Sequence, residues 1–392
     1  MHYMELGGAE RALLGLLYAI DTERVDVDLF INQHTGPFMS LIPDKINLLP
    51  EIPRYSAIER PLMDILREGH LMIFLARLWG TARHGLYMKI HRIKNDGTGS
   101  QFIFDSVSRL LPSLHYLGEY DLAISFLDPP HIVQDKVLAK KKIEWIHTDF
   151  SGKVFSYDPR VTFRRWAAND GIVSISDDVT RSFVSAFPSL AGKIIKIENI
   201  IPASLVKSQA VTGEPAEYSE MGRDIFRICS VGRLCYQKNF DNVPAIASIL
   251  KTRGLKFKWW IVGPGDVESY NALAERYGVA DCVVFLGPRE TPYPYMLHCD
   301  LYVQPSRFEG KAITVQEAQM LGKAVLITNF PTSGSQLMDG EDGVVCGMDN
   351  ASIAQAIASL ACDCGKRKRL GENAEKMHLG NTEEVETIYD LI

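Results

Sequence analysis

The stretch SRFEGKAITVQEA (306–318) places two glutamates, Glu309 and Glu317, eight positions apart. It follows the apolar run DLYVQPS (300–306), which is typical of a buried strand, and it leads into QMLGKAVL (319–326). If a helix begins just after Glu309, the two residues lie ~12 Å apart along its axis. An acidic first turn also favours a helix, so a purely structural role for both glutamates is open.

Compact apolar runs alternate with helical stretches along the whole chain. In the first half they lie at 25–31, 45–50, 121–126, 143–148, 171–176 and 193–199. In the second half they lie at 226–232, 256–263, 282–287, 300–306 and 324–328. Strands that alternate with helices predict an α/β fold with mainly parallel sheets. A chain of 392 residues is too long for one ordinary core, so we expect two Rossmann-like, doubly wound domains that face each other across a cleft.

Changes in composition divide the chain further. We expect an N-terminal domain at 1–201, with a helical insertion at 59–118, and a second domain at 225–380. Residues 202–224 are polar, lack strong periodicity and contain two prolines, which predicts the interdomain connection. Only residues 1–6 precede the first glycine turn, so we expect the chain to start inside the strand that a doubly wound domain places there.

Charge and cysteine usage exclude several classes of protein. The 42 Lys and Arg against 48 Asp and Glu give a net charge of −6, which argues against nucleic-acid binding through the overall field. The seven cysteines form no C-x-x-C pair, and Cys362 and Cys364 are too close together for a zinc knuckle. We expect reduced thiols in a cytoplasmic protein, without a signal peptide or a membrane-spanning run.

The region at 71–95 has apolar residues at helical spacing with cations between them. Such a basic amphipathic helix can lie on an anionic membrane surface. It can equally be an ordinary surface helix that packs on its own domain, and the sequence leaves both interpretations open. The interleaved cations are Arg77, Arg83, Lys89, Arg92 and Lys94.

Glycine turns recur where strands are expected to end. Gly7 and Gly8 directly precede an apolar helix, and Gly263 follows the run KFKWWIV (256–262). Glycines at such turns let backbone N–H groups approach a phosphate at a helix N-terminus. They serve tight turns just as well, so each signal is weak alone. The third glycine of the dinucleotide fingerprint is absent after Gly263, which argues against a nicotinamide cofactor.

Two cations follow the expected strand at 226–232. Arg233 and Lys238 lie in GRLCYQKNFD (232–241), close to the carboxyl end of that strand. Two fixed cations there can neutralise a diphosphate and the charge that it gains as a leaving group. A solvated loop with two surface cations explains the pattern equally well.

The opening stretch fits an elongated ligand. Glu309 can accept hydrogen bonds from sugar hydroxyls, and Glu317 can accept two from a ribose. Between them, the N–H groups of Gly310, Lys311 and Ala312 would face phosphates at the helix N-terminus. The spacing therefore suits a sugar nucleotide.

Taken together, these elements resemble glycosyltransferase family 4, which has the GT-B fold and an E-x-x-x-x-x-x-x-E motif. The resemblance covers nearly the whole chain except the insertion. The segments that carry it are GGAE (7–10), GRLCYQKNFD (232–241), IVGPGD (261–266), FLGPRE (285–290) and SRFEGKAITVQEAQMLGKAVL (306–326).

The resemblance implies a retaining hexosyltransferase that uses a nucleotide-sugar donor and no metal. By donor frequency within the family, the nucleotide would be UDP. Arg233 and Lys238 would hold the diphosphate, Glu309 the donor sugar and Glu317 the ribose. The acceptor would be a glycan or a lipid-linked sugar in polysaccharide biosynthesis, and the protein would be cytoplasmic or peripheral on the inner face of the membrane.

The resemblance also assigns residues outside the second domain. Gly7 and Gly8 match a loop that faces the phosphates. His147, in EWIHTDF (144–150), matches a strand-end histidine near the transferred sugar, whereas alone it favours a structural histidine. The last stretch, 381–392, would cross back to the N-terminal domain as a helix.

One departure from the family pattern concerns Lys311. Many members have phenylalanine and glycine after the first E-G or E-P pair, whereas this chain has Lys311 and Ala312. The identity of the donor therefore does not transfer from the family. Two alternatives remain: a catalytically inactive sugar-nucleotide binder, and a GT-B sugar-nucleotide epimerase, against which the C-terminal motif argues.

Overall fold

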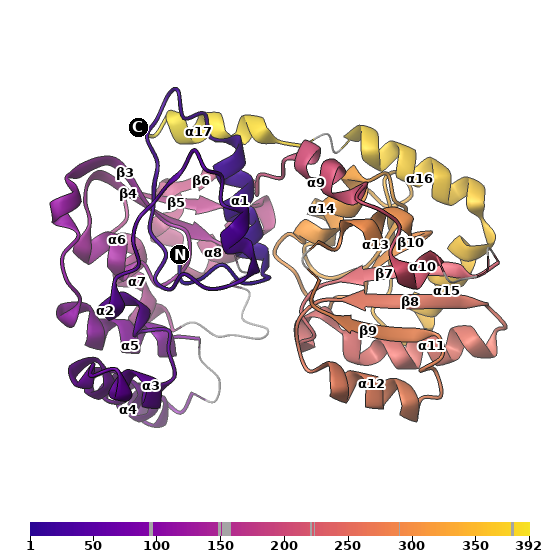
Figure 1. Cartoon of the computed structure of the whole chain (residues 1–392), viewed down its shortest axis with the longest axis horizontal. Coiled ribbons are helices and arrows are strands. Elements are labelled where there is room, and N and C mark those ends of the chain that lie inside the picture. Colours follow the sequence, from indigo (N-terminus) through magenta and orange to yellow (C-terminus); the bar gives the residue numbers. More distant parts are fainter. Residues whose placement is uncertain are drawn as a thin grey trace. The chain divides into compact units, whose positions relative to one another are not determined.

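The computed structural model describes all residues except 94–96, 148–149, 151–157, 220–221, 223, 290 and 378–379. The chain divides into two compact α/β units, each described by itself below (Figure 1). Unit 1 comprises Met1–Glu5, Ala9–Glu198 and Glu383–Ile392. Unit 2 comprises Leu6–Gly8 and Asn199–Thr382.

Unit 2 is built on a six-stranded parallel sheet with the order β12-β11-β10-β7-β8-β9. Its strands are β7 (Phe226–Val231), β8 (Phe257–Val262), β9 (Val283–Gly287), β10 (Leu301–Gln304), β11 (Val325–Thr328) and β12 (Val344–Cys346). The first strand of the unit, β7, therefore pairs with both the second, β8, and the fourth, β10. This is the doubly wound order, and its topological switch point lies between β7 and β10.

Helices cover this sheet and seal its core. They are α11 (Val243–Thr252), α12 (Val267–Arg276), α13 (Tyr293–His298), α14 (Ile313–Met320), α15 (Asn350–Cys362) and α16 (Cys364–Met377). The central strands are almost wholly apolar because both of their faces are buried, and Ile228, Trp259 and Val303 are fully enclosed. The runs predicted at 226–232, 256–263, 282–287, 300–306 and 324–328 correspond to β7 to β11.

Unit 1 contains a four-stranded and a two-stranded parallel sheet. The larger sheet has the order β3 (Glu119–Ser125), β4 (Leu138–Ile146), β5 (Gly171–Ser174) and β6 (Ile194–Lys196). The smaller sheet pairs β1 (Asp28–Leu29) with β2 (Asn47–Leu48). The helices α1 (Gly8–Ala19), α6 (His131–Lys136), α7 (Pro159–Ala167) and α8 (Asp177–Ala186) accompany these strands.

An apolar cavity lies between the two sheets of unit 1. Its volume is about 240 Å³, and residues of α1, β1 and β3 line it, among them Leu16, Leu29 and Leu122. Within the described residues, β1 pairs only with β2 and β3 only with β4. Residues 1–6 form no strand, although the backbone of Met1 bonds to Phe30 and Asn32. The expectation of a buried strand at 1–6 is therefore wrong.

The insertion at 59–118 is helical, as predicted, and packs within unit 1. Its helices are α3 (Leu62–Arg67), α4 (Leu71–His91) and α5 (Gly99–Val107), and α2 (Pro53–Ser56) precedes them. Short 3-10 helices occur at Pro37–Leu41, Ser108–Leu110, His115–Leu117, Pro188–Lys193, Ser333–Ser335 and Thr382–Val385. Phe104 of α5 packs with Tyr55, Ile58 and Leu114 in a buried cluster.

The stretch 202–224 differs from the expected linker, because it contains α9 (Ala203–Ala210) and α10 (Ala216–Ser219) within unit 2. Its few apolar side chains anchor it. Tyr218 is fully buried, with its ring centroid 4.2 Å from that of Trp260, and its hydroxyl donates to the carbonyl of Tyr295. Burial of single side chains thus orders a segment that has little periodicity.

The C-terminal segment belongs to unit 1, where it includes α17 (Glu386–Tyr389). The backbone N–H of Asp21 donates to the Tyr389 hydroxyl at 2.7 Å, and the Arg24 guanidinium pairs with Glu386 at 2.7 Å. This segment is a short helical turn rather than one continuous helix, because Thr382–Val385 is 3-10.

Candidate functional site

The candidate site lies at the carboxyl ends of β7 and β10 in unit 2. These two strands are hydrogen-bonded neighbours, with Ile228 opposite Leu301. Open α/β sheets bind ligands outside the carboxyl ends of their strands, at the switch point. The loop after β7 carries Arg233 and Lys238, and the loop after β10 carries Glu309. The fold thus brings Lys238 and Glu309 into contact, and Arg233 follows the same strand as Lys238.

The loop after β7 places the side chain of Lys238 beside the loop after β10. Gly232 follows the strand, and a Cβ atom added there would lie 3.2 to 3.4 Å from the aliphatic carbons of Lys238. The glycine therefore leaves room for the lysine side chain to cross the turn. Asn239 adopts a left-handed conformation, with φ of 61°, and its amide donates to the carbonyl of Pro305 at 2.9 Å. This bond fastens the loop after β7 to the loop after β10.

Arginine 307 reinforces the same connection between the loops. Its guanidinium forms a two-pronged ion pair with Asp241, at 2.8 and 2.6 Å, and stacks over the ring of Tyr236. Its backbone N–H donates to the carbonyl of Gln237 at 2.8 Å. Bidentate pairs of this kind fix geometry as well as charge, so the loop that bears Lys238 has one defined position against β10.

Glu309 is buried and held by three donors. Lys238 Nζ lies 2.6 Å from Oε1, Ser306 Oγ donates to Oε1 at 2.6 Å, and Gln237 Nε2 donates to Oε2 at 3.1 Å. Ser306 in turn accepts from the buried amide of Gln304 at 2.9 Å. A carboxylate with this many charge-assisted and neutral donors is fixed in orientation before any ligand arrives.

Glu317 lies inside α14 and is fully buried. The hydroxyl of Tyr293, at the start of α13, donates to its Oε1 at 2.7 Å. The structure thus rules out the simplest structural alternative, in which the second glutamate is solvent-exposed. The depth of burial is unexpected, because the sequence predicts an accessible acceptor for ribose hydroxyls.

The helix between the glutamates starts later than expected. α14 begins at Ile313, with Ala312 as its N-cap, so Glu309 lies in the preceding loop and the ~12 Å estimate from helical rise does not apply. The N–H of Ala312 donates to Gln336 Oε1 at 2.6 Å, and the Gln336 amide donates back to the Ala312 carbonyl at 3.3 Å. A phosphate contact through the Ala312 N–H would have to replace this bond to Gln336, and the contact stays a prediction. Gly310 and Lys311 are half-buried in this loop.

Gly263 has a packing role at the end of β8. A Cβ atom added there would lie 2.0 Å from the carbonyl oxygen of Gly232. Its own N–H donates to the carbonyl of Gly287 at 3.0 Å, so that donor is used between the ends of β8 and β9. Gly263 therefore allows neighbouring strand ends to approach closely, and the ligand contact expected of it stays a prediction.

Arg233 is exposed at the rim of this site. Within the part of the chain that the structure describes, its guanidinium makes no hydrogen bond or ion pair. An unengaged guanidinium beside a fixed Lys–Glu pair is available to a phosphate without breaking any protein contact.

His147 follows β4 in unit 1. Its Nε2 lies 3.0 Å from the carbonyl oxygen of Phe126. Because a carbonyl oxygen only accepts, Nε2 carries the hydrogen and Nδ1 keeps its lone pair. Burial lowers the pKa of His147 from 6.5 to about 4, although the bond to Phe126 acts in the opposite direction. The ring is therefore neutral near pH 7 and offers an acceptor, not a positive charge.

Another prediction outside the main part of unit 2 concerns the early glycines, Gly7 and Gly8, which the division of the chain assigns to unit 2. Gly8 is the first residue of α1, and a Cβ atom added there would meet no described atom within 4 Å. Packing within the described chain therefore does not require a glycine at this helix start. The phosphate contact expected of Gly7 and Gly8 stays a prediction.

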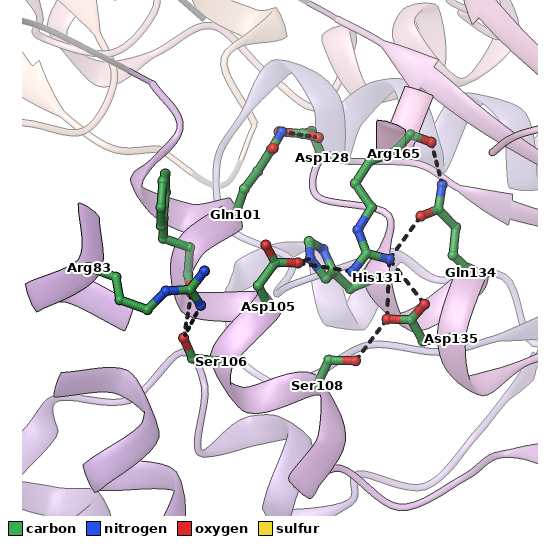
Figure 2. Close-up of polar contacts among 11 residues, drawn as sticks. Arg83, Gln101, Asp105, Ser106, Ser108, Asp128, His131, Gln134, Asp135 and Arg165 are labelled. Carbon is green, nitrogen blue, oxygen red and sulfur yellow. Dashed lines mark hydrogen bonds and ion pairs between the residues drawn. The ribbon is translucent and has the colours of Figure 1, made fainter. Parts of the chain in front are cut away.

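A polar network in unit 1 was missed by sequence reasoning (Figure 2). Asp105 accepts from His131 Nε2 at 2.7 Å and from Arg165 Nη2 at 2.9 Å, and Arg165 also pairs with Asp135 at 3.0 Å. Burial acts to raise the pKa of Asp105, but the bonds from His131 and Arg165 outweigh it and hold the pKa at about 2. The network joins α5, α6 and α7, and no local pattern announces it because its members are far apart in sequence.

A buried acid, Glu144, lies close to this network. Glu144 in β4 is fully buried and accepts from Asn169 Nδ2 at 2.6 Å. Burial, and then the nearby carboxylate of Asp128, raises the pKa of Glu144 well above its usual value. This buried carboxyl group near the carboxyl end of β4 is a further feature that the sequence did not reveal.

No three His, Cys, Asp or Glu side chains are arranged to hold a metal ion in the described ranges. All seven cysteines carry free thiols. None of the described helices combines the length and apolar character needed to cross a bilayer.

Residues 222–377 match the family of glycosyl transferases group 1. This segment, the greater part of unit 2, is therefore related to that superfamily. A Campylobacter jejuni enzyme, N-acetylgalactosamine-N,N'-diacetylbacillosaminyl-diphospho-undecaprenol 4-alpha-N-acetylgalactosaminyltransferase, is 30% identical over 151 residues, which cover 38% of the chain and 40% of that enzyme. The lipopolysaccharide core biosynthesis mannosyltransferase LpcC of Rhizobium leguminosarum is 28% identical over 152 residues, covering 36% of the chain and 43% of LpcC.

Solved structures extend the likeness to the whole chain. Anabaena HepE, crystallised with UDP and glucose, aligns with a TM-score of 0.71 at 16% identity, covering 100% of this chain and 97% of HepE. WaaG, a glycosyltransferase involved in lipopolysaccharide biosynthesis, aligns with a TM-score of 0.61 at 16% identity, covering 100% and 98%. The fold is therefore GT-B, with two Rossmann-like domains, as the sequence predicts.

The curated relatives match only part of their own length. The matches span 42% of an uncharacterized Methanocaldococcus jannaschii glycosyltransferase, and the shares for the two enzymes above are similar. The family match covers residues 222–377, whereas the likeness to solved structures over the whole chain concerns the fold alone.

Proposed function

We propose that the chain is a retaining glycosyltransferase that moves a hexose from a nucleotide-sugar donor, UDP-linked, to a glycan or lipid-linked acceptor. The observation that carries the proposal is the ion pair of Lys238 and Glu309 at the switch point of unit 2. It puts a cation suited to phosphate and an acceptor suited to sugar hydroxyls in direct contact. The group 1 family match over the same residues supports the proposal.

The diphosphate would be held by Arg233 and Lys238. An ammonium has three N–H donors, and one bond to Glu309 leaves donors for phosphate oxygens. Arg233 adds a planar guanidinium that suits two oxygens at once. Both cations would stabilise the charge that grows on the diphosphate as its bond to the sugar breaks.

The donor sugar would bind Glu309, and the ribose would bind Glu317. Glu309 is oriented by Ser306 and Gln237, so its carboxylate needs little reorganisation. Because Glu317 is fully buried beside Tyr293, the ribose role requires the Tyr293 hydroxyl to yield its place to a ribose hydroxyl. The N–H groups of Gly310 and Lys311 would add phosphate contacts.

The chemical step would form a bond between the acceptor oxygen and the anomeric carbon on the face that the diphosphate leaves. The carbon–oxygen bond to the diphosphate breaks, and the acceptor proton passes to the leaving phosphate oxygen. No metal is needed in this scheme, because the two cations supply the positive charge. Nδ1 of His147 in unit 1 would accept a hydrogen bond from the transferred sugar. Gly7 and Gly8, near the start of the chain, would face the phosphates.

The acceptor class rests on the relatives. One acts on an undecaprenol diphosphate-linked sugar, as its name states, and another serves lipopolysaccharide core biosynthesis. A role in cell-surface polysaccharide synthesis at the cytoplasmic face of the membrane fits both. In such a role, the acceptor substrate of the chain would be a lipid-linked saccharide.

A transfer assay tests the proposal. The purified chain is incubated with radiolabelled UDP- and GDP-sugars and with lipid-linked saccharides, and the labelled product is analysed for its anomeric configuration. We expect one UDP-sugar to give a product with retained configuration, and His147→Gln to lower turnover more than UDP affinity. Tight UDP binding without transfer or donor hydrolysis would instead indicate an inactive binder, and release of an epimerised sugar nucleotide would indicate an epimerase.

A further inference from the structure

Helix α4 in unit 1 is anchored through one face only. Its Arg77 donates to the carbonyls of Ala57 and Arg60, at 3.2 and 2.5 Å. A Cβ atom added to Gly80 would lie 2.8 Å from the backbone of α5, so the two helices are in close contact there. Figure 1 shows α3, α4 and α5 grouped at one end of unit 1. The inner face of α4 is thus fixed on its own domain.

The outer face of the same helix is apolar and exposed. Trp79 and Ile90 are 63% and 65% exposed. The exposed apolar residues recur every three to four positions, which places them in one stripe along the helix. We call this set the α4 stripe: Leu71, Met72, Leu75, Leu78, Trp79, Leu86 and Ile90.

The neighbouring helix continues the apolar surface. Met63 and Leu66 of α3 are exposed as well. A contiguous patch of large apolar side chains on a soluble domain is uncommon and marks an interaction surface. Packing within unit 1 does not explain these residues, because the inner face already anchors α4.

Charge around the α4 stripe is positive. Residues 69–93 contain no aspartate or glutamate, in a chain that has 48 of them and a net charge of −6. Lys89 and Arg92 are exposed at the C-terminal end of α4. The surface of α4 is therefore cationic on an acidic protein, which suits an anionic surface. The acids in and beside α3, Asp64 and Glu68, are paired with Arg67 and Arg60.

We propose that the α4 stripe docks flat on an anionic lipid bilayer. The apolar side chains would enter the boundary between headgroups and acyl chains, and Lys89 and Arg92 would contact anionic headgroups. Pairing with a second copy is disfavoured, because it would bring two stripes without acidic residues, and their cations, together. Docking would also give access to a lipid-linked acceptor, a consequence that rests on the proposed function.

Vesicle co-sedimentation with the full chain tests this surface directly. Vesicles of phosphatidylcholine with phosphatidylglycerol are compared with vesicles of phosphatidylcholine alone, at low and high salt. The test variant is Leu75→Ser with Trp79→Ser, and the matched control is Tyr116→Ser, which removes an exposed aromatic side chain elsewhere in unit 1. A charge variant, Lys89→Glu, tests how much the positive charge of α4 contributes to vesicle binding.

We expect binding to anionic vesicles that the stripe variant weakens about tenfold or more, whereas the control leaves it unchanged. Lys89→Glu and high salt should each weaken binding, and melting curves should show both serine variants folded. Failure to bind anionic vesicles, or equal binding by the stripe variant, would overturn the proposal. So would a dimer in sedimentation velocity that the stripe variant dissociates, because a second copy would then cover the stripe. The test needs no donor or acceptor, so its result is independent of transferase activity.

Discussion

Lys238 Nζ and Glu309 Oε1 lie 2.6 Å apart, which joins the loop after β7 to the loop after β10. The two residues are 71 positions apart in sequence, and the parallel pairing of their strands brings them together. The doubly wound order makes this pairing the switch point of the sheet. A ligand that carries both phosphate and hydroxyl groups would contact both Lys238 and Glu309 there.

Substitution of Lys238 by methionine should weaken UDP binding. It removes the cation but keeps the length of the side chain, and we expect the Kd to rise about tenfold because charge-assisted bonds to phosphate are lost. Isothermal calorimetry measures the change. Lys256→Met is the matched control, since Lys256 forms an exposed ion pair with Asp224 in the same unit. Equal UDP affinity of the Lys238 variant and the control would refute the phosphate role.

Gly263→Ala should destabilise unit 2. The added methyl group would lie 2.0 Å from the carbonyl oxygen of Gly232, so strand ends must separate, and we expect a loss of about 2 kcal/mol or more in unfolding free energy. Urea unfolding followed by tryptophan fluorescence measures it. Gly334→Ala is the control, because no atom lies within 4 Å of its added Cβ. If both variants unfold at the same urea concentration, the close-packing role is wrong.

His147 should make the free energy of unfolding depend on pH in the acidic range. Its pKa is about 4 when folded, against 6.5 as the ordinary value, so between these pH values the unfolded chain binds more protons. The contribution of His147 therefore destabilises the fold progressively as the pH falls from about 6.5 to about 4. His147→Gln, which does not titrate, should lose less stability across this window than the wild type. Parallel unfolding curves at each pH give the comparison, and identical slopes would contradict the lowered pKa.

A strand added before Met1 should stabilise unit 1. Residues of β1 and β3 line the cavity of about 240 Å³, and an extended apolar segment against its opening would cover that apolar surface. We expect an extension of about six alternating apolar residues to raise the Tm. Differential scanning calorimetry measures this, with a Gly/Ser extension of equal length as the control. The same Tm for both extensions would show that the cavity does not accept a strand.

The sequence predicts β7 to β11 because each is a compact apolar run, and β7 to β10 end at or directly before a glycine or proline. Prediction from the sequence fails where a segment is held in place by one contact with a residue that is far away in the sequence. Gln336 lies 24 positions from Ala312, and no local pattern shows that its amide occupies the N–H of Ala312. Likewise, α14 starts at Ile313 without a capping side chain, so nothing in the sequence marks its first residue.

The same limit applies to α9 and α10. Their position depends on Tyr218, whose ring packs on that of Trp260. Tyr218 precedes β7 in the sequence, whereas Trp260 lies in β8. The candidate residues of unit 2 were identified by type and spacing. The close approach of Gly263 to Gly232 and the bond of Ala312 to Gln336 join residues far apart in sequence, and no local pattern shows them.

The most direct test of the sugar-nucleotide claim is a calorimetric comparison of UDP and the UDP-sugar donor on three proteins. These are the wild type, Glu309→Gln and Glu317→Gln. If Glu317 holds the ribose, its variant should weaken UDP and UDP-sugar binding alike, by about tenfold. If Glu309 holds the sugar, its variant should keep UDP affinity and weaken only the UDP-sugar. Unchanged UDP affinity in Glu317→Gln would contradict the account.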